Sequence, residues 1–581
     1  MDSIVWGTLK ESPWYLYKYA MAFVQAMNNA ESVASAATTK IGVNGEIVYT
    51  AAGVGDSRVA LFAMLNRGLD TEKLQDAIRT VFADSKKMLQ PQMQLDMFLM
   101  AFQTRDIRGG KGEKQLFYQF MKTLYEQDPC ITTNVVRHIP EYGCWRDMWE
   151  LMKEVPELTD EVLKVVRDTF MTDRLHLAAG STGKMSLLAK WLPREGSTYS
   201  TAAKQIAAFL YPTVTNGNKR MMTYRKDVSD MNKALQTVEI NMCGGAWKTI
   251  NPDRVPGRCL KNHSKAFYNL DQKGDADTLR YPDSHDRMEC RQRFITWKEE
   301  LKAGTKKAKG ADVIMPHELV AQTLQHGRSA DEQDITQAQW ISIREKMAAG
   351  GGLGKAVAMC DFSGSMEGLP KLISLALGIL ISEITHPSFR DHILTFDAEP
   401  TWHSFAGKST LQEKLGSGSP TLGQGLNTDF YKACMCIINR MVTRRVPVGE
   451  EPEDLIVLTD MGFDAASTVR DMNHNYHYQS QPYQLEIIRA MFKTAGEKVW
   501  GKGKGWNPPR IVIWNLRAEY DDFHATADQE GVVQLSGWSP NMLKVLEKGR
   551  VDVQTPYETM RTILDDERYG KIADVWFFTP R

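Results

Sequence analysis

The sequence lacks three features that would assign it directly to a class of protein. Lys and Arg together number 71 and so do Asp and Glu, so the formal net charge is zero and no global field favours a polyanionic partner. The eight cysteines follow no framework spacing, and Cys434 and Cys436 lie closer together than zinc-knuckle ligands do. The longest apolar stretch, residues 372–381, is too short to span a bilayer. A disulfide-stabilised secreted scaffold and a membrane-spanning protein are therefore not expected.

The remaining composition is that of an ordinary soluble protein with several domains. Hydrophobic residues make up 43% of the 581 residues and charged residues 24%, and a chain of this length exceeds what one core accommodates. The first residues show no succession of charged, apolar and small residues typical of a signal peptide. We therefore expect a soluble, intracellular protein of the cytoplasm with no membrane partner.

Residues 1–349 are predicted to form a helical-repeat domain with a small β-hairpin near its start. Residues 40–43 and 46–49 are short apolar segments on either side of Asn44-Gly45, which is a strong hairpin signal. In residues 113–126 the apolar side chains fall on one helical face. Further helical patterns recur every 15 to 25 residues and predict stacked, HEAT-like helical pairs; they cover residues 94–102, 145–155, 161–170, 185–191, 202–211, 231–242 and 316–324.

Residues 350–581 are predicted to form a doubly wound α/β domain. The glycine-rich segment 348–354 marks the boundary, and strand and helix patterns alternate after it. Near-continuous apolar strands that alternate with helices are typical of a buried parallel sheet. The expected strands are 357–361, 392–396, 455–460, 511–516 and 532–535, and the expected helices are 369–384, 430–442, 484–492 and 541–548.

Oxygen-bearing side chains follow two of these expected strands. Asp361, Ser363 and Ser365 come at the end of the first strand, and Asp460 closes a later one. Thr428 stands in a loop just ahead of a helix. Ligands of open α/β sheets bind at the carboxyl edge of the strands, and hard oxygen donors suit Mg²⁺ or Mn²⁺ better than Zn²⁺. The sequence therefore predicts a divalent metal site there.

The order and spacing of these three loops resemble the metal-ion-dependent adhesion site of von Willebrand factor A domains. The resemblance implies that Ser363, Ser365 and Thr428 offer hydroxyl oxygens and that Asp361 and Asp460 act largely through coordinated water. It also implies that the metal keeps a position open for a carboxylate from a protein partner. The alternative is a degenerate A domain that keeps the loops and binds no metal.

Two basic segments are candidates for contacts with phosphate. The turn of residues 105–112 carries Arg108 and Lys111 between glycines, before an expected helix, where a phosphate can bind. It can equally be a structural corner between helices with an Arg–Asp pair. Residues 254–265 carry Arg258, Lys261 and Lys265, which can contact RNA phosphates or form a solvated face.

No catalytic motif is recognisable, so we do not expect an enzyme. The segment 180–186 departs from the nucleotide-binding loop pattern at Ala178 and Met185. Neither a nucleophile–base pair nor a histidine–cysteine cluster can be assigned from spacing.

Several motifs resemble those of TROVE (Ro autoantigen) proteins and, more closely, an uncharacterised family of domains of unknown function related to them. The resemblance to TROVE proteins rests on Asn44-Gly45 with residues 49–53 and on residues 105–113. Residues 142–147, 255–261, 315–319 and 535–538 look like further marks of the second family, and residues 361–365 and 427–429 extend the resemblance over nearly the whole chain. The resemblance implies a ring of helical repeats closed by an A domain. It also implies binding of small structured RNA on the outer face of the ring and of single-stranded RNA ends in its hole.

Two hypotheses follow. The first is a non-enzymatic, Ro-like ribonucleoprotein scaffold whose A domain binds a metal and a partner's carboxylate. The second is a metal-dependent interaction or assembly factor that binds no RNA. The first requires Arg108, Lys111, Lys261 and Lys265 to form a continuous cationic lining, whereas the second predicts that these cations are dispersed or paired with acids.

Overall fold

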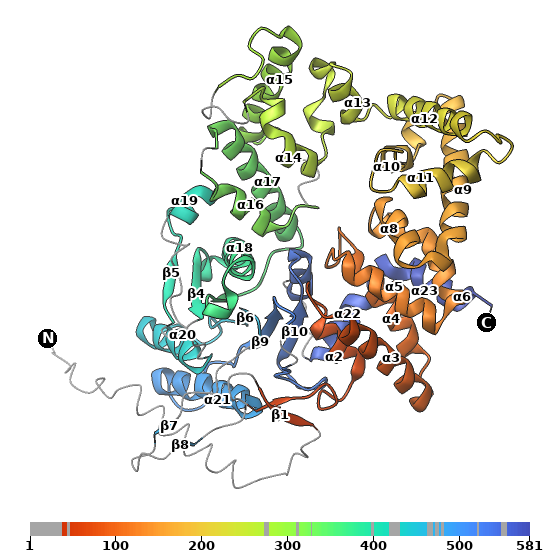
Figure 1. The fold of residues 1–581 in the computed structure, drawn as a ribbon. Coiled ribbons are helices and arrows are strands. Elements are labelled where there is room, and N and C mark those ends of the chain that lie inside the picture. The colour runs from red at the N-terminus through yellow and green to blue at the C-terminus, as the bar shows by residue number, and fades with distance from the viewer. Residues whose placement is uncertain are drawn as a thin grey trace. The chain divides into compact units, whose positions relative to one another are not determined.

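The computed structural model divides the chain into two compact units, each made of two separate stretches of sequence. One unit comprises Met1–Gly68 and Met347–Ile563, and the other comprises Leu69–Lys346 and Leu564–Arg581. The structure describes residues 38–42, 47–271, 278–308, 313–326, 328–396, 400–416, 430–461, 469–470, 476–477, 481–519, 522–547 and 555–580. Figure 1 labels the elements of both units.

This division differs at both ends from the two consecutive domains predicted from the sequence. The hairpin and first described helix belong to the α/β unit, and the last helix belongs to the helical unit. The reason is local packing, because Tyr49 donates its N–H to the carbonyl of Phe523 at 2.8 Å, and the Ser536 hydroxyl donates to the Phe62 carbonyl at 2.6 Å. The predicted change from helical patterns to alternating strands and helices, near residue 350, lies within a few residues of the junction at Met347.

The helical unit is built from helices that pack mainly on near neighbours in the chain. Helix α5 contacts α3, α4, α6 and α8, and α9 contacts α8, α10, α11 and α12, a pattern expected of helical repeats. The helices are α3 Thr71–Met88, α4 Gln92–Arg105, α5 Gln115–Gln127, α6 Pro129–Val135, α7 Ile139–Tyr142, α8 Arg146–Glu154, α9 Thr159–Ala178, α10 Leu188–Trp191, α11 Ser200–Leu210, α12 Gly217–Ala234, α13 Val238–Cys243, α14 Gly257–Phe267, α15 His285–Lys302, α16 Pro316–Thr323, α17 Ala330–Ala348 and α23 Gly570–Phe578. Short 3₁₀ turns used below are η4 Trp247–Thr249, η5 Pro252–Arg254 and η11 Glu567–Tyr569.

Two predicted helices of this unit differ from the structure. The one expected at 185–191 is helical only in α10, Leu188–Trp191, and the one expected at 231–242 is not a single element. Residues 231–242 were expected to be continuous, but α12 ends at Ala234 and α13 begins at Val238. Gln236 between them has φ of 51°, a left-handed conformation that cannot continue an α-helix. The apolar spacing runs through the break, so periodicity alone did not reveal it.

The α/β unit contains a six-stranded sheet with helices on both faces. Along the sheet the order is β10-β9-β6-β3-β4-β5, in which only the β4–β5 pair is antiparallel. Numbered along the chain this is 3-2-1-4-5-6, the order of a doubly wound sheet. The strands are β3 Ala356–Asp361, β4 His392–Phe396, β5 Trp402–Ser404, β6 Asp454–Thr459, β9 Arg510–Asn515 and β10 Val532–Ser536.

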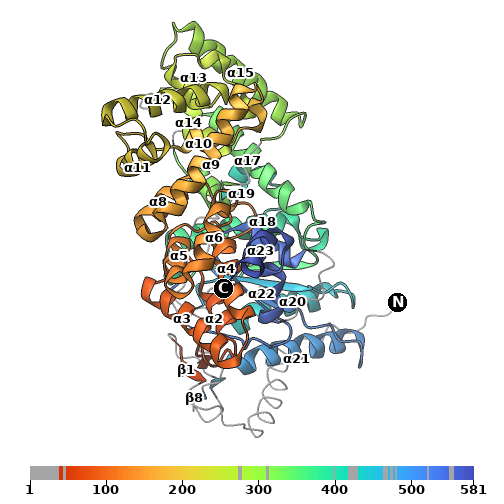
Figure 2. The ribbon, with the colours of Figure 1, turned by 90° about the vertical axis from the view of Figure 1, so that its right-hand side faces the viewer.

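Alternate residues of the strands face two helical layers. Val357, Leu455 and Ile511 pack with the apolar sides of α20 and α21 in one core. On the other face, helix α18 contacts β3, β4 and β6, and α2 contacts β10. The Cys360 thiol of β3 lies 3.7 Å from the carbonyl oxygen of Ser374 in α18. Figures 1 and 2 show these layers within the unit. The remaining elements are β1 Thr39–Ile41, β2 Ile47–Tyr49, α2 Ser57–Met64, α18 Leu369–Ile384, α19 Leu411–Gly416, α20 Phe430–Arg444, β7 Val469–Arg470, β8 Tyr476–His477, α21 Gln481–Trp500, 3₁₀ helix η10 Pro540–Leu546 and α22 Pro556–Leu564.

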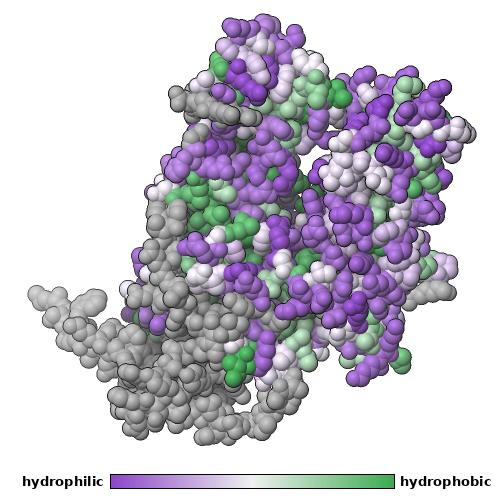
Figure 3. All heavy atoms as spheres, in the orientation of Figure 1, coloured by the Kyte–Doolittle hydropathy of each residue, from purple (hydrophilic) through white to green (hydrophobic). Residues whose placement is uncertain are grey.

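Among the helices of the described residues, none combines the length and apolar character needed to cross a membrane. On the face shown in Figure 3, hydrophilic side chains cover most of the surface that is described.

Candidate metal-binding site

The loops that follow β3 and β6 meet where the sheet reverses its winding direction. These strands are neighbours in register, with Cys360 opposite Leu458. The helix after β3 is α18 and the helix after β6 is α21, and they pack on opposite faces. The two connections therefore diverge, which is the geometry that opens a ligand crevice at the carboxyl ends of the strands.

Asp361 is fixed at this edge by two hydrogen bonds. Its side chain is fully buried, its Oδ1 accepts the N–H of Ser363 at 2.9 Å, and its Oδ2 accepts the hydroxyl of Thr459 at 2.9 Å. Burial raises the pKa of the Asp361 carboxyl, and the neighbouring charge of Asp460 raises it further. Two carboxyl groups in one buried place repel each other, so a cation is favoured there.

The two serines bring their hydroxyls together on the same loop. The Oγ atoms of Ser363 and Ser365 lie 3.1 Å apart, with Ser363 buried and Ser365 exposed to solvent. The turn Gly364–Met366 is a 3₁₀ helix, and Gly368 at φ 87° directly precedes α18. This backbone is left-handed, which favours glycine, and it redirects the chain from the loop into the helix.

Asp460 follows β6 directly and is also fully buried. The next residue, Met461, has φ of 75°, an unfavourable conformation for a bulky side chain that is commonly found at functional sites. The Nε2 of His524 lies 2.8 Å from the Met461 carbonyl oxygen. Burial lowers the pKa of His524 to about 4, so the imidazole is neutral near pH 7 and supports the loop by a hydrogen bond.

Arg517, in the loop after β9, makes a further contact that sequence reasoning missed. Its guanidinium donates to the carbonyl oxygen of Ser365 and pairs with Glu519 at 2.5 Å. Neither Arg517 nor His524 belongs to a local motif. The only signal for Arg517 was its position two residues after β9, and His524 lies in the connection between β9 and β10 without any such signal.

The structure therefore brings together four of the five predicted ligands, Asp361, Ser363, Ser365 and Asp460. Thr428 lies outside the described residues. The donors are all hard oxygens, as Mg²⁺ or Mn²⁺ prefers. Within the described part of the chain no group of three or more His, Cys, Asp or Glu side chains is placed to hold a metal. The candidate site does not count as such a group, because it contains only two carboxylates and its other oxygen donors are hydroxyls.

The five cations predicted to contact RNA do not form a continuous free surface. Arg108 is exposed and donates to the Glu141 carbonyl at 3.0 Å. Arg258 pairs with Glu318 at 3.1 Å, and Lys261 pairs with the same carboxylate. Lys265 is half-buried. Lys111 was expected to be a surface cation, but its side chain is fully buried. Burial lowers the pKa of this amine to about 7.

The glycine-rich turn that carries Arg108 and Lys111 is a structural corner. Arg105 makes a two-pronged ion pair with Asp147, at 2.9 and 3.1 Å, and both side chains are buried. Asp147 also accepts the Tyr118 hydroxyl at 2.7 Å. A Cβ on Gly143 would lie 2.0 Å from the Asp147 Oδ2. The segments 105–112 and 142–147 thus form one interlocked core, and the Arg–Asp interpretation of the turn accounts for its residues.

Comparisons with known proteins give similarity without an assigned activity. Residues 355–573 match the family model described as "Domain of unknown function (DUF7788)", and residues 153–281 match "Domain of unknown function (DUF2828)". Over 463 residues the chain is 26% identical to "Uncharacterized protein L728" of Acanthamoeba polyphaga mimivirus, covering 77% of this chain and 75% of that protein. A solved structure, the Ro (RSR) protein of Deinococcus radiodurans, matches 82% of this chain and 94% of its own at 11% identity and a TM-score of 0.37. A TM-score this low does not by itself show a shared fold.

Proposed function

We propose that this chain is a non-enzymatic scaffold whose α/β unit binds Mg²⁺ or Mn²⁺ and docks a carboxylate of a protein partner. The observation that carries the proposal is the meeting of Asp361, Ser363, Ser365 and Asp460 at the switch point of a doubly wound sheet. The sheet order and its antiparallel edge strand fit the A-domain resemblance.

The four side chains contribute to metal binding in two ways, through negative charge and through neutral oxygen ligands. Asp361 and Asp460 supply negative charge, and the hydrogen bonds to Ser363 and Thr459 fix the orientation of Asp361. Ser363 and Ser365 supply neutral oxygens, so the site does not neutralise a divalent ion completely. A bound divalent ion supplies Lewis acidity, and Mg²⁺ tolerates an exchangeable ligand because it usually keeps several waters.

A protein partner is favoured over RNA by the state of the cations. Arg258 and Lys261 share the Glu318 carboxylate, and Lys111 is buried. Cations that are paired or buried contribute little to phosphate neutralisation, which dominates RNA affinity. The scaffold of the proposal therefore acts through its metal edge, with RNA binding as the competing hypothesis.

The test measures Mn²⁺ binding to the full chain by electron paramagnetic resonance and calorimetry. Ser365→Ala removes an exposed hydroxyl and is expected to weaken Mn²⁺ binding about tenfold, and Asp361→Asn is expected to weaken it further. Ser388→Ala is the matched control, because this serine is exposed on the same unit and lies outside the site. Wild-type protein without Mn²⁺ or Mg²⁺ binding, or equal affinity in Ser365→Ala and Ser388→Ala, would refute the metal site.

The docking step is tested by affinity capture from the native source with and without EDTA. We expect a captured protein to be released by EDTA and to be lost with Ser365→Ala. Strong RNA binding that weakens steeply with added salt and does not depend on the metal would instead favour the ribonucleoprotein hypothesis.

A further inference from the structure

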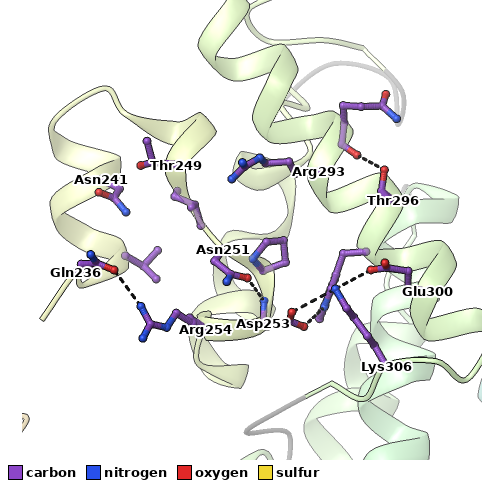
Figure 4. A pocket seen from close by; sticks show the side chains of 15 residues that line it. Gln236, Asn241, Thr249, Asn251, Asp253, Arg254, Arg293, Thr296, Glu300 and Lys306 are labelled. Atoms are coloured by element: carbon purple, nitrogen blue, oxygen red, sulfur yellow. Dashed lines mark hydrogen bonds and ion pairs between the residues drawn. The ribbon is translucent and has the colours of Figure 1, made fainter. Parts of the chain in front are cut away.

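The helical unit contains an open cavity of about 680 Å³, distinct from the metal edge. One wall is formed by residues of α13 and η4, the floor by η5 and its flanking residues, and the opposite wall by α15 (Figure 4). A volume of this order suits a small molecule of metabolite size. Its lining is rich in charged, amide and hydroxyl groups, so it suits a polar ligand.

The two acids of the cavity share one lysine. Lys306 pairs with Asp253 at 3.2 Å and with Glu300 at 2.8 Å, and both pairs are drawn in Figure 4. The other oxygen of Asp253 accepts the indole N–H of Trp297 at 2.8 Å. These groups form a closed network at one side of the cavity, which leaves the negative charges little capacity to attract a further cation.

Two arginines of the same cavity have no acidic partner among the described residues. Arg254 donates to the neutral Oε1 of Gln236 at 2.9 Å. In the part of the chain that the structure describes, no ion pair is formed by Arg254 or by Arg293, and Arg293 is exposed on α15. Figure 4 shows Arg293 extending from α15 toward the wall that carries Asn241 and Thr249. The cavity therefore presents two guanidinium groups that make no ion pair with the described residues, and its three cations and two acids give the lining a net positive charge.

The neutral groups around these arginines are hydrogen-bonding side chains. Asn241 and Thr249 lie on the wall opposite Arg293, Asn251 lies on the floor, and Gln292 is contributed by α15. Val238, which is mostly buried, supplies a small apolar surface beside them. Such a set can bind the hydroxyls and the less polar face of a sugar-sized group while the arginines bind an anion.

We propose that this cavity binds a small molecule that carries a phosphate monoester, such as a sugar phosphate or a mononucleotide. Guanidinium groups bind phosphate oxygens through paired N–H donors. A phosphate monoester carries close to two negative charges near pH 7, which matches two arginines better than a single carboxylate does. The proposal concerns the helical unit and does not depend on the metal site.

The test is calorimetric titration of the full chain with ribose 5-phosphate. The wild type is expected to bind ribose 5-phosphate. Arg293→Gln is expected to weaken this binding at least tenfold, and the double variant with Arg254→Gln is expected to lose it. Arg293 makes no ion pair with the described residues, so its replacement should leave the fold intact, as thermal unfolding will verify. Arg194→Gln is the matched control, since it removes the same charge from an exposed site outside the cavity and should bind like the wild type.

Other probes decide the chemical class of the ligand. Ribose without phosphate should bind at least a hundredfold more weakly, and succinate should compete poorly. Equal binding of succinate would overturn the assignment to phosphate. The proposal is also overturned if the wild type does not bind ribose 5-phosphate at millimolar concentration, if Arg293→Gln binds as well as Arg194→Gln, or if only single-stranded RNA binds.

Discussion

Replacing Arg568 by alanine is expected to loosen the packing of α23 against the other helices of the helical unit. Asp106 is fully buried and receives the Arg568 guanidinium, whose Nη2 lies 2.7 Å from Oδ1. The guanidinium also lies over the Tyr142 ring at 5.3 Å. Without Arg568, a buried carboxylate loses its only ion pair among the described residues.

The magnitude follows from what Asp106 retains. Breaking a buried ion pair costs about 3–5 kcal/mol, but the Arg568 side chain is 32% exposed. Asp106 also keeps the Arg108 N–H at 3.0 Å and the Tyr569 hydroxyl at 3.3 Å. We therefore expect a loss of about 2 kcal/mol, which corresponds to roughly a thirtyfold increase in local opening.

Hydrogen exchange of backbone amides in α4 and α23 measures this opening locally, which suits a protein with two units. Lys571→Ala is the matched control, because Lys571 pairs with Glu141 at 2.9 Å on the surface, where both side chains are largely exposed. That pair should contribute less than about 0.5 kcal/mol. Equal exchange in Arg568→Ala and Lys571→Ala would refute the role assigned to the buried pair.

Two further predictions concern the interlocked corner of the helical unit. Gly143→Ala should lower the apparent Tm by several degrees, because its Cβ would lie 2.0 Å from the Asp147 Oδ2. Gly183 has open space around it, so Gly183→Ala should leave the Tm unchanged. Similar Tm values for the two variants would contradict this prediction. Lys111 loses its proton near pH 7 when folded and near its ordinary value when unfolded. The unfolded state therefore binds more protons between these values, and stability should rise with pH from 7 to 9. Lys111→Met should reduce this rise in Tm, and an unchanged rise would show that burial does not shift this amine.

Elements with a strong apolar pattern were predicted closely from the sequence. The predicted bounds of α18 and β4 agree with the structure, and the other predicted strands lie within one residue or so of β3, β6, β9 and β10. The prediction missed β5, Trp402–Ser404, because three residues are too few to show a period of two. The segment predicted as a helix at 541–548 is the 3₁₀ helix Pro540–Leu546.

The candidate site was predictable only where its groups follow strands directly. Asp361 and Asp460 were identified because apolar strands precede them, and parallel strands end at one edge of a sheet. Arg517 and His524 contact the loops through backbone carbonyls. Such contacts accept many residue types and leave no spacing in the sequence. The burial of Lys111 was likewise hidden, because a glycine-rich basic turn has the same composition whether it faces solvent or a core.

The discontinuous units determine how the metal site has to be tested. A fragment of residues 350–581 would omit α2, whose Phe62 and Ala63 carbonyls accept hydrogen bonds from Ser536 and Asn515 beside the carboxyl edge. Asn66 in turn donates to the Asn515 carbonyl at 3.0 Å, and Asn515 lies in register with Thr459, the residue before Asp460. The same fragment would expose the face of α23 that packs on α4, where Trp576 lies 5.8 Å from Phe98. Removing residues 38–68 should therefore weaken metal binding without changing any ligand, so binding measured on the full chain is the decisive quantity.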